Sequence, residues 1–365
     1  MSDRLNLPLA GIIVLDFGQV FQGPYATLLM AKAGANVIKI EPPHGEPLRR
    51  RAAPGKSTTF PIAMLNSNKR AITLNLKHER GRALLFEMVR RADVLLENFS
   101  PGTMDRLGVG WAELCPVNPR LVYASGSGYG LSGPDRDNLA MDLTIQAVSG
   151  LISTTGFADS PPVKAGPAVV DFLSGIHLYA AVTTALFERE RTGKGRLVEV
   201  AMQEAAYATL TSHIDAYWQS GSVPPRTGNR SHTRSPLNVY PTNDGYVTIN
   251  VAVEEHWHHL LAAMGRETCA TTRVSGPMPL ASRISTRPTL SSARGHGPSA
   301  KWKCSRSPSG TASLAPRCAT SARSCTTRTC TSEACSNGSS TTKSAASSSR
   351  RRHCVFTVRT QWRPH

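Results

Sequence analysis

A short glycine-bearing turn early in the chain has the residue types that could hold a phosphorylated ligand. It follows an apolar run at residues 11–17 and reads Gly-Gln-Val-Phe-Gln-Gly-Pro over residues 18–24. Backbone amides at such a strand-to-helix turn can bind phosphate at the helix N-terminus. The dinucleotide fingerprint GxGxxG is absent, although Glu41 ends the second expected strand as in a dinucleotide fold. The turn therefore does not predict NAD binding.

Other common catalytic motifs are also missing from the sequence. It contains no GxSxG elbow, no Walker A loop and no HExxH pair. These are the patterns of serine hydrolases, phosphate-binding NTPases and zinc peptidases. The chemistry must therefore come from another residue set.

The carboxylate of Asp171 is a second candidate for chemistry. It stands in the segment Val-Val-Asp-Phe-Leu-Ser-Gly, directly before residues 172–191, which are expected to form a long amphipathic helix. A carboxylate can attack an activated acyl group as a nucleophile. An aspartate at this place is also typical of a helix N-cap. The residues alone favour the cap.

The elements that must position these residues alternate between strands and helices. An apolar, β-branched run at residues 11–17 predicts a buried strand, and residues 24–33 predict a helix that stops at Gly34. A second strand is expected at residues 36–41. This βαβ unit favours a parallel sheet.

The same alternation continues through most of the chain. Strands are expected at residues 70–76, 93–97, 120–125, 197–202 and 244–253, with a helix at residues 79–91. A Gly-, Pro-, Ser- and Arg-rich linker covers residues 221–238. The sequence therefore predicts an α/β fold, with a Rossmann-like large domain over residues 1–220. The linker and the start of a smaller domain follow over residues 221–267.

The composition changes abruptly after Glu267. Of the 25 acidic residues, only Glu333 lies beyond it, and of the 8 cysteines only Cys115 lies before it. Most of the formal net charge of +17 therefore belongs to residues 268–365. A lone cysteine, no signal-peptide pattern and no run near 18 apolar residues predict a cytoplasmic protein outside membranes.

Residues 268–365 form a basic Ser-, Thr-, Arg-, Pro- and Cys-rich tail without hydrophobic periodicity. Such a segment is expected to be disordered or non-native. A reading-frame shift explains the tail with one event, since codons compatible with residues 268–275 encode Asp-Leu-Arg-Asp-Asp-Pro-Arg-Phe when read one base earlier. Nucleic-acid binding by the basic tail and zinc binding by its cysteines are the alternatives. The cysteines form no CxxC pair, so the sequence predicts no metal site, and neither alternative is preferred.

A series of short motifs keeps its order over residues 8–265. It comprises Leu-Asp-Phe at residues 15–17, Gly-Pro at 23–24, Gly-Ala-Asn-Val-Ile-Lys-Ile-Glu at 34–41, Asn-Lys-Arg at 68–70, Glu-Asn-Phe-Ser-Pro-Gly at 97–102, Asp-Arg-Leu-Gly at 105–108, Thr-Thr-Gly at 154–156, Asp171 and Gly-Lys-Gly at 193–195. Each motif is weak alone. Together they resemble the family III CoA-transferases of the CaiB/BaiF type, which include formyl-CoA transferase and carnitine CoA-transferase.

This resemblance implies an enzyme that moves CoA from an acyl-CoA donor to a carboxylic acid acceptor through a covalent intermediate on Asp171. It implies coenzyme A as part of the substrate and no permanently bound cofactor. The residues that it places near CoA are Gln19, Val20, Leu74, Lys77, Asn98, Phe99 and Arg106. Lys77 and Arg106 are the expected phosphate partners, although from the residues alone both are solvated surface charges.

The resemblance also implies an interlocked homodimer. In this family the chain leaves the large domain, forms the smaller one and returns, and the returning segment would fall within residues 268–365. If that tail is altered, the chain could be an inactive, truncated relative.

Two residues depart from the family pattern. Racemases of the family carry a histidine directly before Asp142, where this chain has Met141. Racemisation needs a second acid–base group, so CoA transfer is favoured over the isomerase alternative. Formyl-CoA transferase carries a glutamine where this chain has Phe21. Oxalate is therefore not the expected acceptor, and a bulkier or more apolar acyl group is mildly favoured.

Overall fold

The fold was analysed in a computed structural model of the 365-residue chain. The structure describes residues 6–56, 58–231, 234–241, 245–264, 317 and 318. The expectation of a disordered or non-native tail concerns residues 268–365. Of these, only residues 317 and 318 are among the described residues.

The large sheet contains six parallel strands in the order β3-β2-β1-β4-β5-β6. They are β1 (Ile13–Asp16), β2 (Asn36–Glu41), β3 (Arg70–Thr73), β4 (Val94–Glu97), β5 (Val122–Ser127) and β6 (Leu197–Ala201). In the register, Leu15 of β1 lies beside Ile38 of β2 and Leu95 of β4. The strand order reverses between β1 and β4, as in doubly wound α/β proteins. The predicted α/β fold with a parallel sheet is therefore confirmed.

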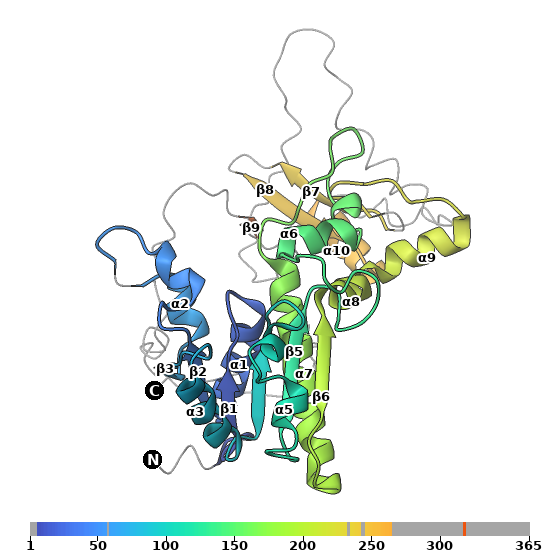
Figure 1. The fold of residues 1–365 in the computed structure, drawn as a ribbon. Coiled ribbons are helices and arrows are strands. Elements are labelled where there is room, and N and C mark those ends of the chain that lie inside the picture. The colour runs from blue at the N-terminus through green and yellow to red at the C-terminus, as the bar shows by residue number, and fades with distance from the viewer. Residues whose placement is uncertain (1–5, 57, 232–233, 242–244, 265–316, 319–365) are drawn as a thin grey trace, which may run out of the picture. The chain divides into compact units, whose positions relative to one another are not determined.

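Helices connect these strands and continue beyond them (Figure 1). They are α1 (Gln22–Lys32), α2 (Phe60–Leu65), α3 (Glu79–Val89), α4 (Thr103–Arg106), α5 (Trp111–Leu114), α6 (Asp142–Val148), α7 (Val169–Thr192), α8 (Met202–Tyr207), α9 (Thr211–Ser220) and α10 (Glu254–Ala263), with short 3-10 turns at Pro47–Arg51, Ile152–Thr154 and Ala208–Leu210. The sequence predicted the long helices α1, α3 and α7. It did not predict the other helices, of which the shortest, such as α4 and α5, have too few residues to show a period.

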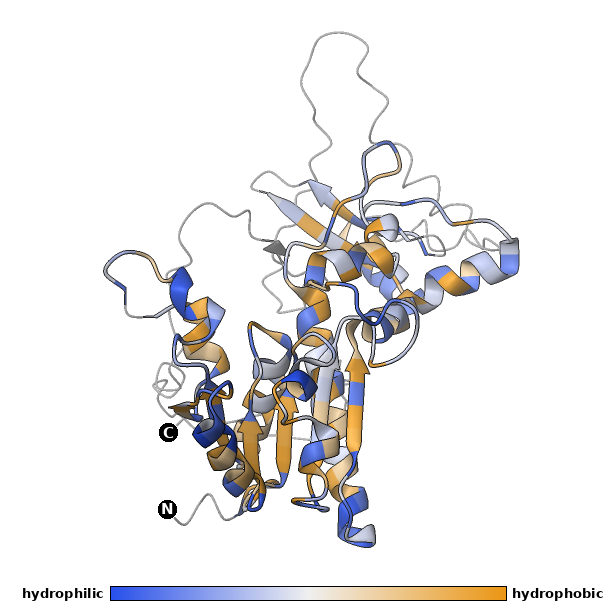
Figure 2. Cartoon of the chain, in the orientation of Figure 1, coloured by the Kyte–Doolittle hydropathy of each residue, from blue (hydrophilic) through white to orange (hydrophobic). Residues whose placement is uncertain are grey.

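Side chains alternate between the two faces of the large sheet, and each face has its own core. On one face the strands pack against α1 and α7, where Met30, Leu178 and Val182 are fully buried. On the other face they pack against α3, α4 and α5, with Leu85 and Leu114 fully buried. Hydrophobic residues accordingly gather on the strands and on the helix sides that face them (Figure 2).

Helix α7 is long and apolar enough to cross a membrane by length and composition alone. A core helix of a soluble protein meets the same criterion. Here Leu178, Val182 and Leu186 belong to the core beside the sheet, so we interpret α7 as a core helix.

A second, antiparallel sheet has the order β7-β8-β9. Its strands are β7 (Leu237–Pro241), β8 (Tyr246–Asn250) and β9 (Arg317–Cys318). Strand β8 confirms the expected strand at residues 244–253, whereas β7 begins inside the stretch expected to be a linker. The predicted division into domains stays a prediction.

Candidate active site

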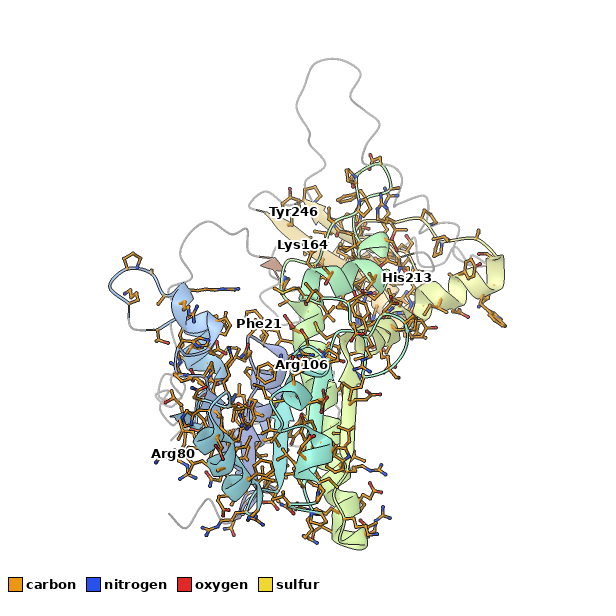
Figure 3. The ribbon with its side chains drawn as sticks, viewed as in Figure 1. Phe21, Arg80, Arg106, Lys164, His213 and Tyr246 are labelled. Atoms are coloured by element: carbon orange, nitrogen blue, oxygen red, sulfur yellow. The ribbon has the colours of Figure 1, made fainter. Side chains whose placement is uncertain are left out.

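The carboxyl ends of β1 and β4 define the place where this fold binds ligands. In open α/β sheets the crevice lies where the strand order reverses, because the connections leave toward opposite faces there. Residues 18–23 leave β1 at this point, and residues 98–102 leave β4 beside them. Phe21 and Arg106 both lie toward this edge of the sheet (Figure 3).

The side chain of Asn98 joins these two turns. Its Oδ1 accepts a hydrogen bond from the Gln19 amide at 2.7 Å, and its Nδ2 donates to the Gln19 carbonyl at 3.1 Å. A Cβ on Gly23 would lie 3.0 Å from the same Oδ1, so glycine allows the close approach. The structure thus brings together two of the residues that the sequence placed near CoA, and Asn98 acts on the backbone of the turn.

Val20 adopts an unusual backbone conformation in the same turn. Its φ is 61°, in the left-handed region that β-branched residues rarely enter. Such a conformation costs of order 1–3 kcal/mol and persists only when its surroundings impose it. The turn is therefore held in shape by its neighbours.

Asp171 lies in the first turn of α7, and a second aspartate supports that turn. The Oδ1 atom of Asp142 accepts hydrogen bonds from the amides of Val170 at 2.8 Å and Asp171 at 3.1 Å. Asp142 is the first residue of α6, so the start of one helix satisfies amides at the start of the other. The Asp171 carboxylate is therefore not needed to cap this helix.

This arrangement corrects two expectations about Asp171. The residue does not precede the helix, because α7 already begins at Val169. It is also not the N-cap, since that position is Ala168 and no side chain there caps the helix. Asp142 supplies the oxygen that a capping aspartate would have supplied, which weakens the purely structural explanation for Asp171.

The environment of Asp171 favours a protonated carboxyl group near neutral pH. Burial raises its pKa from 3.8 to about 7, and the negative charge of Asp142 adds to the rise. Carboxyl groups with raised pKa values are typical of catalytic sites. A carboxylate with such a pKa is also more basic than an ordinary aspartate, which suits attack on an acyl carbon.

Aromatic side chains pack beside Asp171 where α7 meets α1. The ring of Phe172 lies 5.7 Å from that of Phe21 and 4.9 Å from that of Tyr25, between ring centroids. One turn further along α7, a Cβ on Gly175 would lie 2.8 Å from the carbonyl oxygen of Gln22. The N-terminal turns of α1 and α7 are therefore in close contact through Phe172 and Gly175, and Asp171 directly precedes Phe172 in the chain.

The remaining predicted CoA residues lie around the same edge of the sheet. Phe99 packs against the core on the α3 side, and its amide donates to Glu97 at 2.8 Å. Arg106 is exposed and donates to the hydroxyl of Thr103 at 3.0 Å. Leu74 follows β3, where its amide donates to the Glu41 carbonyl at 2.8 Å.

Lys77 is exposed beyond β3. Among the described residues, no hydrogen bond or ion pair joins its side chain to Gln19, Asn98 or Asp171. The structure thus unites Gln19, Val20 and Asn98 directly, whereas Lys77 and Arg106 remain solvent-facing cations.

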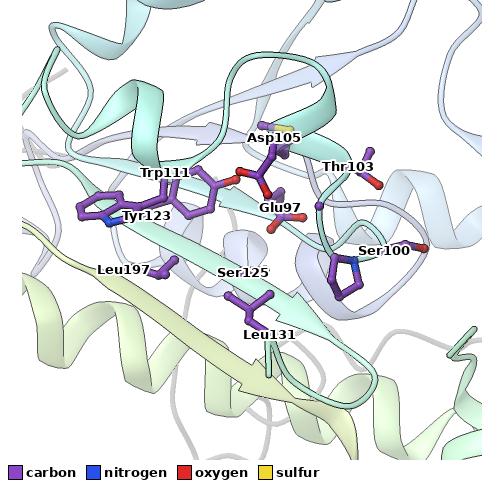
Figure 4. Close-up of a pocket in the computed structure, with 12 residues that line it drawn as sticks. Glu97, Ser100, Thr103, Asp105, Trp111, Tyr123, Ser125, Leu131 and Leu197 are labelled. Carbon is purple, nitrogen blue, oxygen red and sulfur yellow. The ribbon is translucent and has the colours of Figure 1, made fainter. Parts of the chain in front are cut away.

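A separate small pocket of about 100 Å³ opens between β4, β5 and α4 (Figure 4). Glu97, Asp105, Tyr123 and Ser125 line it, but Asp171 and the predicted CoA residues do not. Burial raises the pKa of Glu97 to about 7, with a smaller contribution from Asp105. This pocket is therefore distinct from the site around Asp171.

Sequence reasoning missed a set of buried charges beneath the turn at residues 18–20. Lys39 donates from Nζ to the Gly18 carbonyl at 2.6 Å, and Glu46 lies 3.7 Å from the same Nζ. Asp16 pairs with Lys69 at 2.9 Å. The sequence contained a signal for this set: Lys39 is a charged residue within the largely apolar strand β2, and a charge buried there needs a buried partner.

The fold defines a doubly wound α/β protein in which the turns after β1 and β4 meet at the topological switch point through Asn98. Comparison with known proteins narrows this class. The model of CoA-transferase family III matches residues 9–291 of the chain. The chain belongs to CoA-transferase family III, and it is a transferase.

Several characterised or solved proteins are similar to this chain. Acetyl-CoA:oxalate CoA-transferase from Acetobacter aceti is 37% identical over 299 residues, which cover 81% of this chain and 77% of that protein. Succinyl-CoA–D-citramalate CoA-transferase from Chloroflexus aurantiacus is 36% identical over 275 residues, or 74% and 68% of the two chains. A crystal structure of a CaiB/BaiF family protein from Brucella suis has a TM-score of 0.67 and 31% identity, covering 73% and 72%.

Proposed function

We propose that this chain transfers CoA between carboxylic acids through a covalent intermediate on Asp171. The position of Asp171 carries the proposal: it is largely buried, Asp142 accepts from the helix amides in its place, and the neighbouring Phe172 packs against Phe21 of the β1–α1 turn. Family membership supports the overall reaction.

The proposed reaction has two symmetrical halves. A carboxylate oxygen of Asp171 attacks the thioester carbonyl of acyl-CoA, and the CoA thiolate leaves as a mixed anhydride forms. The thiolate then attacks the aspartyl carbonyl, which releases the first acid and leaves an aspartyl-CoA thioester. The acceptor carboxylate reverses these steps: it displaces the thiolate, and the thiolate takes the acceptor acyl group and regenerates Asp171.

The amides at the start of α7 have a limited role in this scheme. Those of Val170 and Asp171 donate to Asp142, so they are not available to stabilise an oxyanion while that bond lasts. Asp142 instead holds the peptide that carries the nucleophile. It also keeps the pKa of Asp171 high, which keeps the carboxylate basic once it is ionised.

We propose that CoA lies along the β1–α1 turn and the loop after β4. Gln19, Val20, Asn98 and Phe99 would border the ligand there, with Leu74 as an apolar contact. Lys77 and Arg106 are exposed cations suited to phosphate, and Arg106 can bind a phosphate with two donors. The enzyme would keep no permanent cofactor, and its proposed setting is a cytoplasmic homodimer.

The acceptor is proposed to be a small dicarboxylic acid. The similar enzymes act on oxalate and on D-citramalate, which both carry two carboxylates. Phe21 distinguishes this turn from the glutamine that formyl-CoA transferase carries. Oxalate therefore belongs in the test panel, with larger dicarboxylates expected to react better.

Isomerisation within the same family is the competing activity. Met141 is 62% exposed and has no proton to exchange, so it cannot return a proton to an acyl α-carbon. Deuterium wash-in at that carbon during incubation with acyl-CoA would support the isomerase. Its absence, with CoA transfer observed, supports the transferase.

The test is a transfer assay with acetyl-, formyl- or succinyl-CoA and a panel of oxalate, malate, citramalate and glutarate. The proposal expects a new acyl-CoA to form with at least one pair and Asp171→Asn to abolish it. Transfer that survives Asp171→Asn would overturn the assigned nucleophile.

A further inference from the structure

The β1–α1 turn carries strain that must be held by contacts around it. Val20 has a φ of 61°, which glycine adopts easily and valine does not. The peptide groups beside Val20 are tied down on both sides. The Gly18 amide donates to the Asp16 carboxylate at 2.8 Å. The backbone amide and the backbone carbonyl of Gln19 both form hydrogen bonds with the side chain of Asn98.

Two buried charged residues hold the rest of the turn. Lys39 donates from Nζ to the Gly18 carbonyl at 2.6 Å, while Glu46 accepts from the Val20 amide at 3.4 Å. Each side chain is only 1% exposed, and the two charged groups lie 3.7 Å apart. Together they form hydrogen bonds with the Gly18 carbonyl and the Val20 amide, on either side of Gln19.

The cost of burying these charges argues that they serve the turn. A buried ion pair often stabilises a fold no better than apolar residues of equal size. Lys39 occupies an interior position of β2, beside Asp16 in the register. What an apolar side chain could not do is bond to the Gly18 carbonyl.

We infer that Lys39 and Glu46 are positioning residues that hold residues 18–20 in the strained conformation that receives CoA. This inference rests on the proposed placement of CoA at the β1–α1 turn. Neither side chain would touch CoA, because both lie beneath the turn and are almost fully buried. They act through the backbone of Gly18 and Val20.

The test measures the Kd of CoA by titration calorimetry, along with the melting temperature and the KM and kcat for acyl-CoA. Lys39→Met should weaken CoA binding and raise KM by about tenfold or more, because the turn must regain its strained shape on binding. The value of kcat should change less, since Asp171 is not disturbed. Glu46→Gln, which is nearly isosteric, should show the same effect more weakly and serves where Lys39→Met does not fold.

A second substitution separates positioning from a general loss of stability. Adding Val20→Gly to Lys39→Met should restore most of the CoA affinity, because glycine reaches a positive φ without strain. Arg189→Met is the matched control. Arg189 is 3% exposed and pairs with Asp93 at 3.0 Å near the end of α7, far along the chain from Asp171. It should lower the melting temperature without changing the Kd of CoA.

The outcomes distinguish this inference from the proposed function. Wild-type protein that binds CoA, with Lys39→Met and Glu46→Gln weakened and rescued by Val20→Gly, supports the inference. Wild-type protein that binds CoA, with both variants binding as tightly or with Arg189→Met equally weakened, overturns the inference alone. Wild-type protein that does not bind CoA overturns the proposed function and this inference with it.

Discussion

At the scale of single residues, Asp171 is set apart by the cost of ionising it. Burial and the nearby Asp142 raise its pKa to about 7, so the folded protein favours the neutral carboxyl group. An unfolded aspartate ionises near pH 4 and the folded one near pH 7, so the contribution of Asp171 to folding stability falls as the pH rises from about 4 to 7 and is lowest above pH 7. A residue kept for stability alone would not be placed this way.

Replacing Asp171 should therefore separate activity from stability. Asp171→Asn removes the nucleophile, and CoA transfer is expected to fall by about 10³-fold or more. The melting temperature at pH 8 should stay equal or rise, since the variant buries no charge. Thermal unfolding and a transfer assay on the same preparation check this. A large loss of stability at pH 8 would support a structural role instead.

The activity should depend on pH through the same group. The value of kcat/KM is expected to fall as the pH drops below about 7, because the attacking carboxylate becomes protonated. Asp142→Asn keeps an oxygen that can accept from the two helix amides but removes the charge. Its acidic limb should move to lower pH, yet stay above the ordinary value for aspartate because burial is the larger cause. An acidic limb that does not move would contradict the electrostatic role of Asp142.

The residue types of the site were partly predictable, and their contacts were not. Asp171, Gln19 and Asn98 were proposed from short sequence motifs, which identify a residue by its position along the chain. The role of Asp142 depends on two helices meeting at their N-termini, 28 residues apart in the chain. No local sequence pattern predicts a contact between two such distant helix ends. The hydrogen bond between Lys39 and the Gly18 carbonyl is likewise a long-range contact that no local pattern predicts.

At the scale of elements, the contact between α1 and α7 holds the start of α7, which carries Asp171, against the start of α1. Gly175 allows this contact, because a Cβ there would lie 2.8 Å from the backbone oxygen of Gln22. A backbone atom cannot rotate away as a side-chain end can. The two helices would have to move apart to admit a side chain.

Gly175→Ala should consequently destabilise the protein although alanine is the better helix former. Helix propensity alone would add about 1 kcal/mol, whereas overpacking costs about 1–3 kcal/mol. We expect a lower free energy of unfolding in a urea titration and a reduced kcat. Gly166→Ala is the control, since nothing lies within 4 Å of its added Cβ. A Gly175→Ala variant more stable than wild type would contradict the close contact.

The elements themselves were largely predictable where periodicity is strong. Strands β1, β2 and β4 are largely apolar runs and α7 has 24 residues, so these strands and this helix are recognisable in the sequence. Helices α4 and α5 have four residues each, too few to show a period. Helix α6 was missed for the same reason, and with it the position of Asp142.

At the scale of the whole molecule, the described surface suggests a partner copy. Several large apolar side chains are exposed on α6 and α9 and in the segment before α6. Examples are Leu139 at 83%, Met141 at 62% and Trp218 at 85%. Leu139, Met141 and Leu143 follow closely along one short stretch of chain at the start of α6, and clusters of exposed apolar side chains mark interaction surfaces.

We therefore predict a homodimer in solution. Sedimentation equilibrium of the purified full-length chain should give twice the monomer mass of 39.3 kDa. The dimer should persist at high salt, because apolar burial is not screened as charge pairs are. A monomer at micromolar concentration would contradict the prediction.

Asp171 is expected to become covalently attached to CoA during turnover. The direct test incubates the enzyme with acyl-CoA without acceptor, quenches it in acid and maps the peptides by mass spectrometry. We expect a CoA adduct on Asp171 that an acceptor carboxylate discharges and that Asp171→Asn lacks. An adduct on another residue, or active turnover with no adduct on Asp171, would show that Asp171 is not the nucleophile.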